Sequence, residues 1–210
     1  MPLAEDLMVA DFEQCFEQMR HYDQSYRHSF EFGFAGMLAV IAASGTLIQQ
    51  YGFTPIVLTT VGILLLASSV VGFLFFVVSL ARNRVYFAFV ARYVNEFRAL
   101  YLKEAPGGVG NRAGMYTDPR YPRIFGPGSS HSVQVWLLCL CNAALLAVAV
   151  NALLAAPAAT PSISWWAGLI VFLISLPGQV VWVLIYWSRK ERQRTADSAV
   201  FGKEREHGLV

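Results

Sequence analysis

The fold is decided by residues 32–81, which read FGFAGMLAVIAASGTLIQQYGFTPIVLTTVGILLLASSVVGFLFFVVSLA and contain no Asp, Glu, Lys or Arg. A second uncharged run extends over 65 residues, from Ile124 to Ser188. A helix of about 20 apolar residues crosses the hydrocarbon core of a bilayer, so each run is long enough for two crossings. We therefore expect an all-α integral membrane protein with four transmembrane helices in two hairpins.

The composition of the whole chain agrees with this class. Only 14% of the 210 residues are charged and the mean hydropathy is +0.46, whereas an average soluble domain has about 25% charged residues. Residues with turn chemistry divide both uncharged runs. The first is divided by YGFTP at 51–55, where Pro55 suits the first turn of a helix. The second is divided by AAPAATPSIS at 155–164, which carries Pro157 and Pro161.

The distribution of basic residues predicts the orientation. Of the 16 Lys and Arg, two precede the first span, eight lie between the hairpins, six follow the last span and none lies in the turns. By the positive-inside rule, both termini and the central segment face the cytoplasm of a bacterial inner membrane. The expected segments are 1–31 (amphipathic helix continuing into the first span), 32–81 (hairpin 1), 82–130 (helix extension and Gly/Pro-rich loop), 131–188 (hairpin 2) and 189–210 (charged tail).

Both cytoplasmic helices carry many aromatic residues. The N-terminal one has more acidic than basic residues, so we expect it to pack against protein rather than lie on a membrane surface. The second helix should continue to about Lys103, and its six aromatic residues within 86–101 form too wide an apolar surface for a lone helix. They pack either against the N-terminal helix or against a neighbouring subunit. The candidate interface residues are Phe12, Phe16, Met19, Phe89, Tyr93, Phe97 and Tyr101.

The segment from Gly107 to Ser130 combines turn signals with aromatic residues, which are unlike a solvated linker. We expect an ordered loop that acts as a clasp, with Tyr116 and Tyr121 at an interface. Its basic residues Arg112, Arg120 and Arg123 either contact lipid phosphates or another anion, or pair with acidic residues of the cytoplasmic part, such as Glu96.

Uncharged polar and small residues inside the spans suggest how the helices pack. The row of Ala35, Ala39 and Ala43 permits close helix approach. Asn142, Asn151 and Gln179 either form hydrogen bonds between helices or line an uncharged pore, and Pro177 is expected to kink the fourth span.

No motif in the chain indicates catalysis. GGVGNR at 107–112 lacks the lysine of a phosphate-binding loop, and no ionisable residue lies inside the spans, which argues against a proton relay or an ion-coupled carrier. We expect no cofactor, no metal and no nucleic acid, and we expect membrane lipids and protein subunits as partners.

Three stretches together resemble a known group: HYDQSYRHSFEFGFAG, RNRVYFAFVARYVNEFR and NRAGMYTDPRYPRIFGPGSSH. They are similar to bacterial four-helix inner-membrane proteins of the RipA family of octameric membrane proteins. The resemblance covers roughly residues 12–154, implies a homo-oligomer and carries no catalytic motif. The paired spans and cytoplasmic helices are also similar to bacterial conflict-system effectors, although no sensor domain accompanies them here.

Three functions follow as hypotheses. The first is a non-enzymatic, homo-oligomeric inner-membrane protein, a scaffold or pore-like assembly with a cytoplasmic collar. The second is an accessory subunit that docks onto a larger membrane complex through its aromatic cytoplasmic helix. The third is a membrane enzyme that acts on lipid. The size and composition of the purified particle distinguish the first two.

Overall fold

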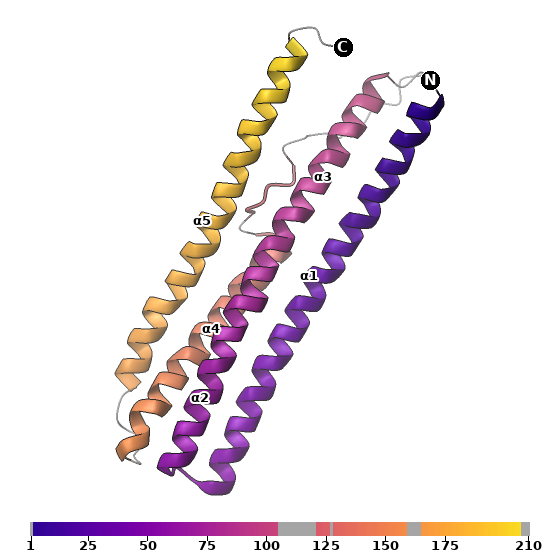
Figure 1. Cartoon of the computed structure of the whole chain (residues 1–210). Helices are drawn as coiled ribbons and strands as arrows, with labels where there is room; N and C mark the ends of the chain where they lie inside the picture. Colours follow the sequence, from indigo (N-terminus) through magenta and orange to yellow (C-terminus); the bar gives the residue numbers. More distant parts are fainter. Residues whose placement is uncertain (1, 105–120, 127, 159–164, 207–210) are drawn as a thin grey trace. The chain divides into compact units, whose positions relative to one another are not determined.

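The computed structural model describes residues 2–104, 121–126, 128–158 and 165–206. These residues are almost entirely helical, and no strand occurs among them (Figure 1). In chain order the elements are α1 (Pro2–Tyr51), α2 (Pro55–Val71), the π-helical segment η1 (Gly72–Val77), α3 (Val78–Glu104), α4 (Ser130–Ala155), the 3-10 segment η2 (Ala156–Ala158) and α5 (Trp165–Glu206).

Charged and apolar parts of the sequence share the same helices. α1 passes from the charged N-terminal segment into the first apolar run without a break (Figure 1). α2, η1 and α3 follow one another directly, so the second apolar run continues into charged sequence as far as Glu104. Both continuities were predicted from the lack of helix-breaking residues at these borders, and the structure confirms them.

The turn between α1 and α2 is built by local chemistry. Gly52 adopts a left-handed φ of 70°, and its N–H donates to the carbonyl of Ile48 at 2.9 Å. Such a residue terminates a helix with least strain when it is glycine. Thr54 then caps α2, because its hydroxyl accepts from the N–H of Val57 at 3.3 Å, and Pro55 occupies the first turn. The prediction for this turn is confirmed.

Four helical stretches are long and apolar enough to cross a membrane, as predicted: Val9–Tyr51, Pro55–Glu96, Ser130–Ala155 and Trp165–Gln193. The apolar window in α4 is the most buried of the four, and that in α5 is the least buried. The chain therefore has the composition and the helix lengths of a multi-pass membrane protein.

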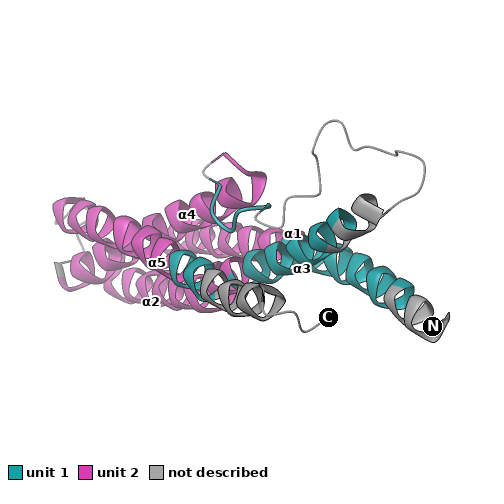
Figure 2. Ribbon diagram, turned by 90° about the horizontal axis from the view of Figure 1, so that it is seen from above, with its two compact units in different colours: residues 1–26, 82–126, 187–210 teal, residues 27–81, 127–186 magenta. Residues whose placement is uncertain are grey.

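The chain divides into two compact units (Figure 2). We call residues 1–26, 82–126 and 187–210 the charged unit, and residues 27–81 and 127–186 the apolar unit. All Lys and Arg except Arg27, and all Asp and Glu except Glu31, belong to the charged unit. The division of the chain by packing therefore coincides with its division by charge.

Small residues set the packing of the apolar unit. α2 packs along α4, and a Cβ at Gly62 would come within 2.6 Å of the Leu153 side chain. A Cβ at Gly33 of α1 would likewise meet Phe76 of η1 at 2.7 Å. These two glycines let neighbouring helices approach closely, which is how helices associate in a medium without a hydrophobic driving force.

Candidate functional site

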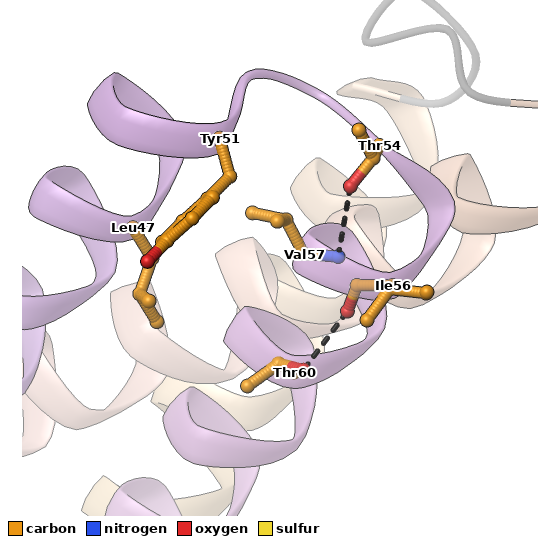
Figure 3. Close-up of a pocket in the computed structure, with 6 residues that line it drawn as sticks. All are labelled: Leu47, Tyr51, Thr54, Ile56, Val57 and Thr60. Carbon is orange, nitrogen blue, oxygen red and sulfur yellow. Dashed lines mark hydrogen bonds between the residues drawn. The ribbon is translucent and has the colours of Figure 1, made fainter.

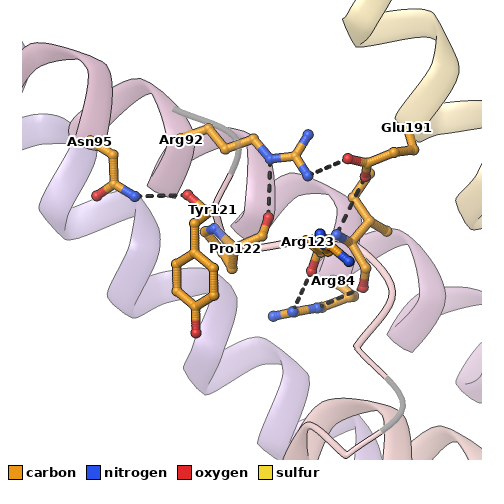
Figure 4. A network of polar contacts seen from close by, with 8 residues as sticks. Arg84, Arg92, Asn95, Tyr121, Pro122, Arg123 and Glu191 are labelled. Carbon is orange, nitrogen blue, oxygen red and sulfur yellow. Dashed lines mark hydrogen bonds and ion pairs between the residues drawn. The ribbon is translucent and has the colours of Figure 1, made fainter. Parts of the chain in front are cut away.

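In the charged unit, a short segment is held by its own backbone carbonyls. Residues 121–124, which we call the strap, present four successive carbonyl oxygens to side chains of α3 (Figure 4). Asn95 Nδ2 donates to Tyr121 O at 2.7 Å, and Arg92 Nε donates to Pro122 O at 3.0 Å. Arg84 binds the last two carbonyls, those of Arg123 at 2.8 Å and Ile124 at 3.1 Å.

The donors of this network share one side of α3. Positions 84, 92 and 95 fall within about 80° of the helix circumference at 3.6 residues per turn. These donors take the place of the partners that a strand or helix would give to the strap carbonyls. The carbonyl of Ile124 needs such a donor most, because its hydrogen bond is buried. The Ile124 side chain is fully buried beside them.

Glu191 of α5 completes the network. Its Oε1 lies 2.6 Å from Nη2 of Arg92, and its Oε2 accepts from the N–H of Ile124 at 3.4 Å. One carboxylate thus joins α3, the strap and α5 (Figure 4). This ion pair joins residues that are 99 positions apart in the chain.

Arg84 is a buried cation, with 5% of its surface exposed. Its guanidinium is satisfied by the two strap carbonyls and lies over the Phe87 ring at 5.7 Å. Burial lowers the pKa of Arg84 from its ordinary value of 12.5, but a guanidinium keeps its charge at neutral pH. The carbonyl dipoles of the strap therefore hold a desolvated positive charge.

The aromatic residues of α3 contact α1 within the charged unit. The Tyr93 hydroxyl donates to Asp11 Oδ2 at 2.7 Å, and this bond is the main cause that raises the pKa of Tyr93 to about 12. Tyr22 stacks on Tyr86 with ring centroids 5.6 Å apart. The Arg98 guanidinium lies over the ring of Phe16 at 5.1 Å. The sequence left two partners open for the aromatic residues of α3, the N-terminal helix and a neighbouring subunit. The contacts described above are made with the chain's own N-terminal helix.

The other predicted interface residues differ in their surroundings. Phe12 packs edge-on against Phe16 with ring centroids 4.8 Å apart, and Met19 and Phe89 are half-buried. Tyr121 contributes its carbonyl to the strap, while the residue as a whole is 58% exposed. Tyr116, Arg112 and Arg120, and the side chains of Phe97 and Tyr101, lie outside the described part of the chain.

In the apolar unit, polar side chains bond between helices. The Ser69 hydroxyl of α2 donates to the backbone carbonyl of Asn142 at 3.3 Å, and Asn142 Nδ2 donates to Gln179 Oε1 of α5 at 3.1 Å. Asn151 Oδ1 accepts from the N–H of Gly168 at 3.0 Å, near the beginning of α5. α5 runs through Pro177 as one helix.

The predicted alanine row faces outward. Ala35, Ala39 and Ala43 are exposed on α1, and a Cβ at Gly36 beside them would meet nothing within 4 Å. This contrasts with Gly33 on the same helix, whose missing Cβ leaves room for Phe76. Among the residues that the structure describes, none lies close enough to Gly36 to explain a glycine there.

A hollow of about 410 Å³ lies at the turn between α1 and α2 (Figure 3). Its wall includes Leu47, Tyr51 and Val57. The Thr60 hydroxyl, which also lines it, donates to the carbonyl of Ile56 at 2.9 Å. The wall is therefore suited to hydrocarbon rather than to a polar substrate. Among the described residues, no cluster of His, Cys, Asp or Glu is placed to hold a metal ion.

Arg84, Asn95 and Glu191 were not singled out by the sequence. The available signal was weak: Arg84 and Arg92 lie on the side of α3 away from most of its aromatic residues, where basic residues are usually solvated. Arg84 and Asn95 bind backbone carbonyls, and Glu191 accepts from a backbone N–H, and such backbone partners cannot be predicted from a pattern of side chains. Comparison with known proteins adds no relative, because no family model, curated protein or solved structure matches the chain.

Proposed function

We propose that this chain is a non-enzymatic scaffold of a bacterial inner membrane that assembles as a homo-oligomer, with both termini and the charged unit in the cytoplasm. The observation that carries the proposal is the outward face of small residues on α1. The resemblance to octameric four-helix membrane proteins supports the same assembly. The charged unit would then form the cytoplasmic collar.

The orientation rests on charge. All basic residues except Arg27 belong to the charged unit, and the turns on the opposite side of the uncharged runs carry none. Moving such a unit across the bilayer is opposed, so it stays on the side of synthesis. Two hairpins, each with its turn outside, are the arrangement that places all three charged segments on one side.

The oligomer rests on helix packing in lipid. Ala35, Gly36, Ala39 and Ala43 fall within about 100° of the α1 circumference and are exposed. Glycine inside a helix is less favourable than alanine by about 1 kcal/mol, and no contact of Gly36 with the described residues explains it. Small residues at helix surfaces in membranes allow backbones to approach closely. A second copy of the chain is the partner that this face fits.

Particle mass tests the assembly. Ala39→Leu should shift the purified particle from a multiple of the 23.3 kDa chain toward smaller species, measured by light scattering in mild detergent. Ala144→Leu is the matched control, since Ala144 is also exposed but lies on α4. A wild-type particle of one chain would refute the proposal. An unrelated protein that co-purifies at fixed stoichiometry would favour the accessory-subunit hypothesis instead.

Anionic phospholipids are the proposed lipid partners. Arg82, Arg123 and Arg189 each border an uncharged run and are exposed. Within the described residues, none of the three guanidinium groups has an ion-pair partner. Unpaired cations next to a span attract anionic headgroups, each by about 1 kcal/mol. Of the loop arginines predicted from the sequence, Arg123 belongs to this set.

A further inference from the structure

Three irregular features of the apolar unit coincide at Asn142. The π-helical segment η1 begins at Gly72, three residues after Ser69, whose hydroxyl donates to the Asn142 carbonyl. In α5, Pro177 lies two residues before Gln179, which accepts from Asn142. A π-helical turn and an internal proline both disturb the regular helical hydrogen bonds. Two neighbouring helices are therefore irregular at the level where the third carries a buried amide.

The Asn142 amide has an unpaired oxygen. The side chain is buried, with the residue 2% exposed, and its Nδ2 donates to Gln179 Oε1 at 3.1 Å. Its Oδ1 is buried and accepts no hydrogen bond in the structure. A buried carbonyl without a donor costs about 1 to 3 kcal/mol, and in a bilayer no bulk water is available to it.

Gly72 opens the backbone beside this oxygen. A Cβ at position 72 would lie 2.8 Å from Asn142 Oδ1 and 2.6 Å from the terminal methyl of Met37. The N–H of Gly72 is shared between the carbonyls of Ser68 and Ser69, so the helical ladder is loosened there. Glycine is thus required by the position of the Asn142 oxygen, and any group that pairs with this oxygen must be small.

The neighbouring amide has the complementary unused group. The one hydrogen bond that the structure gives to the Gln179 side chain is accepted by Oε1, which leaves the Nε2 donor without a partner in the described residues. The amide pair therefore has one free acceptor, Asn142 Oδ1, and one free donor, Gln179 Nε2. A water molecule can donate to the first and accept from the second, and buried waters commonly satisfy such groups.

We propose that the Asn142–Gln179 pair binds a water molecule inside the membrane-spanning region, beside Gly72. The ligand is neutral, because residues 32–81 and 124–188 supply no charge to balance an ion. It is a hydrogen-bond donor, because the orphan atom is a carbonyl oxygen. The site belongs to a single chain, so it holds whether or not the protein forms an oligomer.

Water-edited solid-state NMR of the full chain in lipid bilayers tests the site. The side-chain amide signals of Asn142 and Gln179 should receive magnetisation from water, while the backbone amide of fully buried Leu138 should not. Gly72→Ala should abolish the transfer, because its Cβ occupies the space next to Oδ1. Gly178→Ala is the matched control, since a Cβ at Gly178 meets nothing within 4 Å, and it should leave the transfer unchanged.

Several results would contradict the proposed water site. Absence of transfer to both amides in the wild type would overturn the proposal, as would transfer that survives Gly72→Ala at full strength. A direct Gln179 Nε2–Asn142 Oδ1 bond in an experimental structure would overturn it too. Should Gly72→Ala not fold, Gln179→Leu removes the donor while keeping Gly72, and transfer to Asn142 should then fall to the level at Leu138.

Discussion

Arg92 of α3 and Glu191 of α5 form an ion pair in which Nη2 and Oε1 lie 2.6 Å apart. The Arg92 side chain is only 11% exposed, whereas that of Glu191 is 40% exposed. The same arginine holds the carbonyl of Pro122, and the same carboxylate accepts from the N–H of Ile124. The pair therefore has two functions in the charged unit, since it joins two helices and fixes the strap between them.

Glu191→Gln should destabilise the charged unit. The substitution keeps the size of the side chain but removes the charge, so Arg92 is left partly buried without a counter-charge. Because Glu191 is substantially solvated, we expect a loss of about 1 kcal/mol rather than the several expected for a fully buried pair. Thermal unfolding in detergent measures it. Arg192→Gln, an exposed neighbour in the same helix, should leave the midpoint unchanged.

Arg84→Met should release the strap. It keeps much of the apolar stem but removes both donors, so the buried carbonyl of Ile124 and the partly buried carbonyl of Arg123 lose their partners. Leaving buried groups unpaired costs about 1 to 3 kcal/mol each. Hydrogen exchange of residues 121–126 should accelerate more than tenfold, while exchange in α4 stays as in the wild type. Unchanged exchange at Ile124 would show that the strap does not depend on Arg84.

Much of the fold could be predicted because its determinants are local. The uncharged runs predict the spans. Gly52 and Pro55 predict the first turn, because glycine is favoured just past the end of a helix and proline in the first turn of one. The Arg84 and Glu191 contacts could not be predicted, since they join distant segments and involve backbone groups, two carbonyls for Arg84 and the N–H of Ile124 for Glu191. The π-helical segment at 72–77 could not be predicted either, because its residues GFLFFV are typical of an ordinary apolar α-helix.

The bond between Tyr93 and Asp11 predicts a response to alkaline pH. The pKa of Tyr93 is raised in the folded protein from 10.0 to about 12, so folding favours the protonated phenol. This contribution to stability is complete below about pH 10 and is lost as pH rises toward 12. The thermal midpoint of wild type should therefore fall more steeply over this window than that of Tyr93→Phe. Tyr86→Phe, whose ring also contacts α1, should keep the wild-type slope.

Replacing Arg82, Arg123 and Arg189 together by Gln should weaken the retention of anionic phospholipid. Each arginine next to the membrane contributes about 1 kcal/mol of attraction to an anionic surface, so at physiological ionic strength the association constant for anionic lipid should fall roughly a hundredfold. Native mass spectrometry of protein released from phosphatidylglycerol nanodiscs counts the retained lipids. Phosphatidylcholine nanodiscs should show no difference between the variants, because the interaction requires a net negative headgroup.

The control for this lipid contact lies in the same charged unit. Arg98→Gln removes one positive charge, but the Arg98 guanidinium lies over the ring of Phe16 and its position is sixteen residues past Arg82, about 24 Å along the helix. At physiological ionic strength, attraction between exposed charges decays over about 8 Å. Arg98→Gln should therefore retain anionic lipid like the wild type. An equal loss in both variants would mean that net charge, rather than the three border arginines, holds the lipid.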